Sequence, residues 1–275
     1  MSRSTLHGLR IAITGGGRGI GLATARELHA RGAAVVIGDL DGDLAAQAAT
    51  AISADVLGLP LDVSDHASYA AFLQAATAEG PLDVLVNNAG VMPIGRFIEQ
   101  SPETLRRALE VNVLGCLHGM SLALPPMLDR GAGHIINVAS TAGKSPVPGG
   151  VAYCATKSAV VALTETARVE HSGSGVAFTC VMPHFTNTEL IAGTRPTRLI
   201  PVVEPEDVAR AIADAVASKP KDVYVPKLVG AILRTQPLFG RRLRDSLNSR
   251  LGAYDTFLTF DRDKRAAYDD RVKRS

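Results

Sequence analysis

Short apolar runs rich in β-branched residues alternate regularly along this chain with longer alanine-rich segments. The runs are continuous, as expected for strands covered on both faces, and the segments between them have helical period and composition. The predicted strands are 9–14, 33–38, 56–61, 82–86, 134–139, 176–182 and 223–225, and the predicted helices are 20–31, 43–52, 65–79, 102–129, 151–171 and 205–218. This alternation predicts βαβ units with right-handed crossovers and a parallel sheet of about seven strands.

Two α/β folds share this order of elements, the doubly wound Rossmann-like sheet and the TIM barrel. A barrel needs an eighth strand–helix unit, which the sequence after residue 225 does not supply, so we predict the doubly wound sheet. Residues 1–225 are assigned to its domain, and residues 226–275 to a basic, helical C-terminal extension. Ligands bind such sheets at the edge where the strands end.

The 275 residues carry a formal net charge of +2, which gives no reason to expect a nucleic-acid partner. Three cysteines, none at metal-ligand spacing, predict reduced thiols and a cytoplasmic protein without a metal site. The first ten residues lack the apolar core of a signal peptide. Because no run of about 18 apolar residues is present, we expect no transmembrane segment.

The C-terminal extension differs in charge, since residues 226–275 contain 12 basic and 6 acidic side chains. Between residues 226 and 251, leucines recur at helical spacing with arginines among them, which is typical of basic amphipathic helices. Such a helix packs against its own subunit or against a partner subunit, with its basic face in solvent. Alternatively, it lies peripherally on an anionic membrane. Residues 254–273 are highly charged and are predicted to form a surface helix.

A glycine-rich loop follows the first predicted strand and leads into a helix, with the sequence Thr14-Gly15-Gly16-Gly17-Arg18-Gly19-Ile20-Gly21. Glycines allow a tight turn, close backbone approach to a pyrophosphate, and close packing of helix on strand. The helix amino terminus supplies free N–H groups and the positive end of its dipole to the phosphates. The alternative is a glycine-rich turn that binds no ligand. The position of the loop after the first strand of a βαβ unit favours the phosphate-binding loop over this alternative.

Asp39 ends the second predicted strand, 18 residues after Gly21. A carboxylate there accepts hydrogen bonds from both hydroxyls of an adenosine ribose and repels a 2′-phosphate, which favours NAD over NADP. Arg18 favours NADP instead, because a guanidinium in the loop can hold a 2′-phosphate. An alternative role for Asp39, the N-cap of the next helix, can be filled equally well by Asp41.

Tyr153 and Lys157 lie at the start of a predicted helix, and their spacing places them on one face, one turn apart. A neighbouring ammonium lowers the pKa of a phenol, so Tyr153 becomes a usable general acid and base for an alcohol or carbonyl. Ser140 follows a strand at the ligand edge, where its hydroxyl can bond the same substrate oxygen. Asn112 is unusual inside a helix and predicts a local kink that frees a backbone carbonyl for a water.

In this order the motifs resemble those of the short-chain dehydrogenase/reductase family, over roughly residues 8–226. The matching positions are the glycine-rich loop, Asp62-Val63, Asn87-Asn88-Ala89-Gly90, Asn112, Ser140, Tyr153 and Lys157. The resemblance implies an NAD(P)-dependent oxidoreductase that interconverts a secondary alcohol and a ketone, working as a homodimer or homotetramer.

The resemblance also implies a role for each matching residue. Tyr153 exchanges the hydroxyl proton and Ser140 orients and polarises the substrate oxygen. Lys157 holds the nicotinamide ribose and tunes Tyr153, and Asn112 completes a water-mediated proton relay. The adenine would meet Asp62 and Val63, and the adenosine ribose would lie along residues 88–90. The predicted cofactor-binding set is Gly15, Gly17, Arg18, Gly19, Ile20, Asp39, Asp62, Val63, Asn88, Ala89, Gly90, Tyr153, Lys157, Pro183, Thr186 and Thr188.

One position departs from the family pattern. After the sixth strand the family usually has Pro-Gly and then a Thr that binds the carboxamide, whereas here His184 follows Pro183 and Thr188 is kept. A histidine beside the nicotinamide predicts a narrower pocket, and a role as base is disfavoured because Tyr153 already fills it. Apolar residues of the substrate loop and its neighbours predict a lipophilic alcohol or ketone as substrate, namely Met92, Val147, Leu190, Ile191, Leu199 and Ile200.

A second hypothesis, from another class of protein, is a sensor or scaffold that binds a dinucleotide without catalysing a reaction. Intact Ser140, Tyr153 and Lys157 argue against it, because a protein that only binds a dinucleotide needs no phenol. Turnover of hydrophobic alcohols or ketones distinguishes the two.

Overall fold

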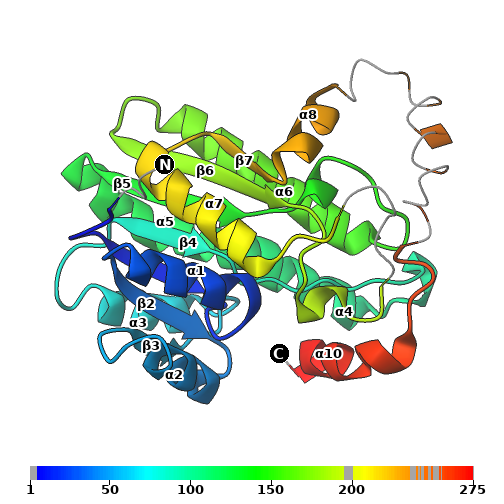
Figure 1. Cartoon of the computed structure of the whole chain (residues 1–275), viewed down its shortest axis with the longest axis horizontal. Helices are drawn as coiled ribbons and strands as arrows, with labels where there is room; N and C mark the ends of the chain where they lie inside the picture. Colours follow the sequence, from blue (N-terminus) through cyan, green and yellow to red (C-terminus); the bar gives the residue numbers. More distant parts are fainter. Residues whose placement is uncertain are drawn as a thin grey trace.

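The structure, a computed structural model, describes residues 5–194, 201–235 and 256–274, with single positions at 240, 242, 245, 246, 249 and 254. Its centre is a seven-stranded parallel sheet in the order β3-β2-β1-β4-β5-β6-β7 (Figure 1). The strands are β1 (Arg10–Thr14), β2 (Ala34–Asp39), β3 (Leu57–Pro60), β4 (Val84–Asn87), β5 (Gly133–Val138), β6 (Val176–Pro183) and β7 (Asp222–Val225). The strand order reverses between β1 and β4, which confirms the doubly wound Rossmann-like fold over the barrel.

Helices cover both faces of the sheet, as its continuous apolar strands predicted. One core cluster joins the sheet to α1 (Gly19–Ala30), α2 (Gly42–Thr50) and α7 (Pro205–Ser218). A second cluster, on the opposite face, joins it to α3 (His66–Ala76), α5 (Gly115–Arg130) and α6 (Val151–Glu170). Figure 1 shows α1 and α7 packed side by side across the near face. The predicted strands and helices are confirmed, most with ends shifted by one to three residues.

The long helix expected over residues 102–129 is divided into three parts. These are α4 (Pro102–Leu109), a π-helical turn η2 (Glu110–Leu114) and α5. The π turn contains Asn112, which confirms a local irregularity at this residue. Within the described residues, Pro102–Arg130 is the one helical stretch long and apolar enough to cross a membrane, but Met120, Leu124 and Met127 pack in the core of the domain. We therefore interpret it as a core helix.

Short turns and the C-terminal helices surround the ligand edge of the sheet. The 3₁₀ turns are η1 (Phe97–Glu99), η3 (Thr141–Gly143) and η4 (Glu189–Ile191), and the helices after β7 are α8 (Lys227–Thr235) and α10 (Arg262–Arg274). The helix predicted within residues 254–273 is confirmed, but it is not simply a surface element, because Arg265 and Tyr268 are buried in it. Most of the predicted amphipathic stretch between 236 and 251 lies outside the described residues.

Candidate active site

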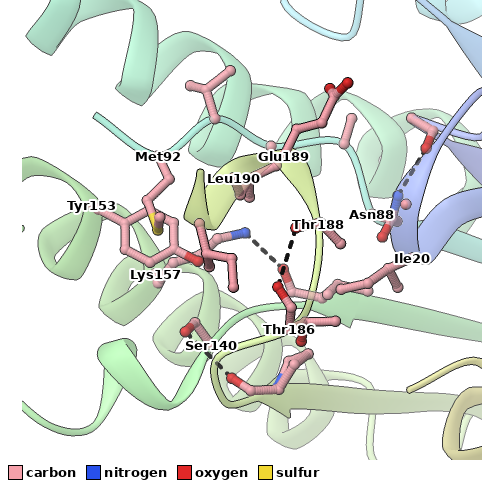
Figure 2. A pocket seen from close by; sticks show the side chains of 18 of the residues that line it. Ile20, Asn88, Met92, Ser140, Tyr153, Lys157, Thr186, Thr188, Glu189 and Leu190 are labelled. Atoms are coloured by element: carbon pink, nitrogen blue, oxygen red, sulfur yellow. Dashed lines mark hydrogen bonds between the residues drawn. The ribbon is translucent and has the colours of Figure 1, made fainter. Parts of the chain in front are cut away.

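The strand ends bring most of the predicted site residues to one cavity of about 820 Å³ at the carboxyl edge of the sheet. In Figure 2, Ile20 and Asn88 lie at one end of this cavity, and Ser140, Tyr153 and Lys157 at the other. The predicted residues that line it are Gly15, Arg18, Gly19, Ile20, Asp39, Asp62, Val63, Asn88, Ala89, Gly90, Ser140, Tyr153, Lys157, Pro183, Thr186 and Thr188. Gly17 and Asn112 are absent from this lining, and both contact residues near it. Within the described chain, no group of three His, Cys, Asp or Glu side chains could hold a metal ion.

The glycine-rich loop makes a tight turn into α1. Gly15 and Gly19 have φ values of 63° and 53°, a backbone conformation that favours glycine. A Cβ on Gly21 would lie 2.0 Å from the carbonyl oxygen of Gly15, so the helix packs this closely only with glycine there. The first turn of α1 has neither a side-chain cap nor an acidic residue. Its N–H groups and positive dipole end therefore suit an anion at this edge of the cavity.

Asp39 and Arg18, the two residues with opposite implications for the cofactor, have different partners. Oδ2 of Asp39 accepts a hydrogen bond from the backbone N–H of Gly17 at 3.0 Å. The N-cap of α2 is Asp41, whose Oδ1 accepts from the N–H of Leu44 at 3.0 Å, so Asp39 is not the cap. Arg18 forms an ion pair with a carboxylate of η4, Glu189, at 3.4 Å.

Asn88 joins the end of β4 to the glycine-rich loop. Its Nδ2 donates to the carbonyl oxygens of Thr14 at 2.9 Å and Gly15 at 3.1 Å. The hydroxyl oxygen of Thr14 accepts in return from the backbone N–H groups of Asn88 and Ala89, both at 3.0 Å. These four bonds fix the middle of the cavity wall, where the strand order reverses.

Tyr153 and Lys157 lie buried on one face of α6, at the other end of the cavity. Nζ of Lys157 donates to the carbonyl oxygen of Val138 at 2.9 Å and lies 5.9 Å from the centre of the Tyr153 ring. The hydroxyl of Ser140 accepts from the N–H of Ala142 at 3.1 Å and donates to the carbonyl oxygen of Pro183 at 3.4 Å. Its side chain also lowers the pKa of Tyr153. Three of the four side chains predicted to be catalytic are therefore close together.

The electrostatics of this group differ from the expectation. Burial raises the pKa of Tyr153 above its ordinary value, and the side chain of Ser140 opposes this shift. Burial also lowers the pKa of Lys157, whose ammonium is bonded to the backbone of Val138 rather than to the phenol. In the protein alone the pKa of Tyr153 is thus raised by burial, and not lowered as expected. Tyr153 is a neutral phenol, the form that can donate a proton.

Asn112 is fully buried behind the cavity wall. Its Oδ1 accepts from the N–H of Val91 at 2.8 Å, and its Nδ2 donates to the carbonyl of Val91 at 2.8 Å and to Oγ1 of Thr156 at 3.0 Å. A Cβ on Gly90 would lie 3.1 Å from Oδ1 of Asn112 and 3.3 Å from Nζ of Lys157. Asn112 in the π turn therefore holds the loop after β4. Its side chain and that of Lys157 both approach this loop at Gly90.

His184 lines the cavity with a neutral imidazole. Its Nδ1 is 3.1 Å from the hydroxyl oxygen of Thr141, and its buried Nε2 has no hydrogen-bond partner within the described chain. Burial lowers the pKa of His184 to about 4, so the ring is uncharged near neutral pH. Of the predicted apolar lining, Met92, Val147, Leu190 and Ile191 are in place, and Leu199 and Ile200 lie outside the described residues.

Sequence reasoning missed one wall of the cavity. Residues of the last segment of the chain line it beside Tyr153, namely Phe257, Tyr268, Arg271 and Val272. Phe257 and Tyr268 were the signal in the sequence that could have indicated this wall. Only 4% of the chain is aromatic, and these two aromatic residues stand among charged ones.

Comparison with known proteins agrees with this geometry. Residues 10–199 match the family model for short chain dehydrogenases. The chain is 31% identical over 253 residues to 17-beta-hydroxysteroid dehydrogenase 13 of Rattus norvegicus, covering 90% of this chain and 84% of the relative. It is 33% identical over 229 residues to the ketoacyl reductase HetN of Nostoc sp., covering 81% and 80%.

A solved structure shares the fold. A short-chain dehydrogenase/reductase from Burkholderia phymatum in complex with NAD superposes with a TM-score of 0.76 at 29% identity, covering 86% of this chain and 94% of that chain. The chain therefore belongs to the short-chain dehydrogenase/reductase family, as its motifs indicated. The relatives named above are a dehydrogenase and a reductase.

Proposed function

We propose that the chain is an oxidoreductase that interconverts a lipophilic secondary alcohol and its ketone, with NAD(H) as cofactor. One observation carries the proposal: a single cavity joins the glycine-rich loop and Asp39 to Ser140, Tyr153 and Lys157. Membership of the family supports the class of reaction, and its relatives include a hydroxysteroid dehydrogenase and a ketoacyl reductase.

The residues at the first end of the cavity fit a dinucleotide. The uncapped first turn of α1 can accept a pyrophosphate. The carboxylate of Asp39, fixed by Gly17, suits a free ribose 2′-hydroxyl, and Arg18 is engaged by Glu189, which together favour NAD over NADP. When bound, the nicotinamide supplies or accepts the hydride.

The residues at the second end suit proton exchange with a substrate oxygen. The neutral phenol of Tyr153 donates its proton to a ketone oxygen, to which the hydroxyl of Ser140 also donates a hydrogen bond. The ammonium of Lys157 stabilises the phenolate that remains. Oxidation of an alcohol reverses these proton steps. The protein contributes to the rate by holding these groups in position around the substrate oxygen.

The apolar lining supports a lipophilic substrate. Met92, Val147, Leu190 and Phe257 form the wall around the phenol, and few polar groups converge there. A catalytically silent sensor or scaffold is the second candidate. It is disfavoured because the hydroxyl groups of Ser140 and Tyr153 are gathered at an apolar end of the cavity, an arrangement that suits proton exchange with a substrate.

We also propose that the protein works in the cytoplasm as a homodimer or homotetramer. Large apolar side chains exposed on α4, η2, α5 and α6, namely Leu109, Leu114, Leu117 and Val169, support self-association. On α8, Leu228 and Ile232 are exposed beside Lys227, which supports peripheral membrane contact as an alternative for this face. Co-sedimentation of the full chain and of Leu228→Ser/Ile232→Ser with anionic vesicles tests that alternative.

Reduction of a panel of cyclic and long-chain ketones, followed by the absorbance of NADH or NADPH, tests the proposed function. We expect turnover with NADH, and we expect Tyr153→Phe to lower kcat by about 10²–10⁴-fold with unchanged NADH affinity. No turnover with any substrate, together with unchanged cofactor binding in Tyr153→Phe, would support the sensor instead.

A further inference from the structure

The last segment of the chain forms a wall of the substrate end of the cavity. Phe257 packs with Met92, Ala142 and Tyr153 in one buried cluster. Tyr268 and Val272 of α10, red in Figure 1, line the same cavity. This segment lies beyond residues 10–199, the part matched by the family model. The wall next to the phenol is therefore built from residues outside the shared catalytic core.

Arg265 connects α10 to two other walls of the cavity. Its side chain is fully buried. Nη1 donates to the carbonyl oxygens of Leu190 at 2.8 Å and Ala192 at 3.3 Å, and Nη2 donates to that of Met92 at 2.5 Å. Nε forms an ion pair with Asp269, one turn along α10, at 3.0 Å. A single guanidinium thus joins the loop after β4, the η4 segment and the C-terminal helix.

Two neighbours on α10 strengthen the same connection. The hydroxyl of Tyr268 accepts the backbone N–H of Met92 at 2.8 Å, so both backbone groups of Met92 are bound by α10. The guanidinium of Arg265 lies 4.6 Å from the centre of the Tyr268 ring. Arg271 forms an ion pair with Glu189 at 2.6 Å, so η4 is also held from a second position.

The choice of arginine follows from this geometry. Three carbonyl oxygens on two segments need a planar fork of donors, which a guanidinium has and a lysine ammonium lacks. Without the guanidinium, the buried carbonyl of Met92 and the partly buried carbonyls of Leu190 and Ala192 lose this partner, which disfavours the packed arrangement. Arg265 itself is not among the residues that line the cavity.

We propose that Arg265 is a positioning residue that fixes α10 as the wall of the substrate compartment and so determines which substrates fit beside Tyr153. The inference deepens the proposed function and rests on it, because it assumes that the substrate occupies this end of the cavity. Arg265 acts through Met92, Phe257 and Tyr268 rather than by touching the reacting atoms. Its loss affects binding of the substrate and leaves the chemistry and the cofactor end in place.

The test compares Arg265→Met with Arg265→Lys and with Lys264→Met, a matched control on the adjacent, exposed position of α10. Four quantities are measured in each: kcat and KM over the ketone panel, the dissociation constant of NADH, the affinity of the cavity for the fluorescent lipophile 1-aminoanthracene, and amide hydrogen exchange. Tyr268→Phe, which removes only the hydroxyl bonded to Met92, is the milder variant to use if Arg265→Met does not fold.

We expect Arg265→Met to raise KM for the preferred ketone about tenfold, to weaken 1-aminoanthracene binding to a similar extent, and to leave kcat within about threefold. The NADH dissociation constant stays unchanged, and exchange rises in residues 188–194 and 256–274 but not in β1 or α1. Arg265→Lys does not restore KM, and Lys264→Met matches the wild type. Tyr268→Phe also raises KM, but only about threefold.

The proposal is overturned if Arg265→Met, or Tyr268→Phe in its place, matches Lys264→Met in KM and probe affinity. It is also overturned if kcat falls while KM is constant, or if exchange rises throughout the sheet. If the wild type reduces no ketone, the proposed function fails. The probe affinity and the local exchange then still decide whether Arg265 shapes the compartment.

Discussion

The backbone N–H of Gly17 donates to Oδ2 of Asp39 at 3.0 Å, which joins the glycine-rich loop to the end of β2. A Cβ on Gly17 would lie 2.9 Å from the same oxygen, so a side chain at this position would displace the carboxylate. The loop therefore does more than approach a phosphate, because it also orients the carboxylate expected to meet the adenosine ribose.

Replacing this carboxylate should change the cofactor preference. In Asp39→Ser we expect NADH affinity to fall about tenfold and NADPH affinity to rise, because the 2′-phosphate is no longer repelled and Arg18 is close by. Titration of the fluorescence of the reduced cofactors measures both. Asp43→Ser, at an exposed position on α2, should leave both affinities unchanged. An equal loss of NADH and NADPH binding in Asp39→Ser would contradict the role in discrimination.

The neutral ring of His184 should restrict substrate size without taking part in proton transfer. We expect His184→Gly to improve kcat/KM for bulky ketones relative to small ones, about tenfold, because it removes a side chain from the lining. Since burial lowers the pKa of His184 to about 4, the pH profile of kcat between pH 6 and 9 should be the same in both proteins. Loss of a titrating limb in the variant would show that His184 is a catalytic base.

Asn112 should contribute strongly to stability through its side chain. Asn112→Ala removes three hydrogen bonds of a fully buried side chain, and both backbone groups of Val91 lose this partner. We expect the free energy of unfolding to fall by about 3 kcal/mol in urea titrations. Asn187→Ala, at an exposed position, should change it by less than about 0.5 kcal/mol. Similar effects of the two substitutions would contradict the structural role of Asn112.

The buried His134 should make the fold sensitive to acid. Burial lowers the pKa of His134 to about 3, so as pH falls below about 6.5 the unfolded chain takes up a proton and the folded chain does not. This group alone should reduce the free energy of unfolding by about 2.5 kcal/mol between pH 7 and pH 4.5. In urea unfolding, His134→Gln should reduce the loss of unfolding free energy between pH 7 and pH 4.5 by that amount. His7→Gln, at an exposed position, should not change this loss. Parallel curves for the wild type and His134→Gln would disprove the assignment.

Much of the fold and of the site follows from patterns that are local in the sequence. A strand covered on both faces is apolar at most positions, so β1, β4 and β5 are visible as nearly continuous apolar runs. Residues that follow such runs share one edge of a parallel sheet, which is why Asp39, Asn88 and Ser140 could be placed together. The kink at Asn112 was predictable because its amide disfavours a regular helix interior.

The remaining features depend on contacts that no local pattern records. Arg265 bonds to Met92 across 173 positions of sequence, and its charged surroundings on α10 are those of an ordinary solvated helix. Likewise, the spacing of Tyr153 and Lys157 gives their shared face but not their burial, and burial sets the direction of both pKa shifts.

The wall provided by α10 has a consequence for biosynthesis. All seven strands and the glycine-rich loop leave the ribosome before residues 256–274, and domains generally fold as units during translation. A nascent chain can therefore complete its nucleotide groove while Phe257 and Tyr268 are still in the exit tunnel. The wall of the proposed substrate compartment is completed later than the nucleotide groove, when α10 docks.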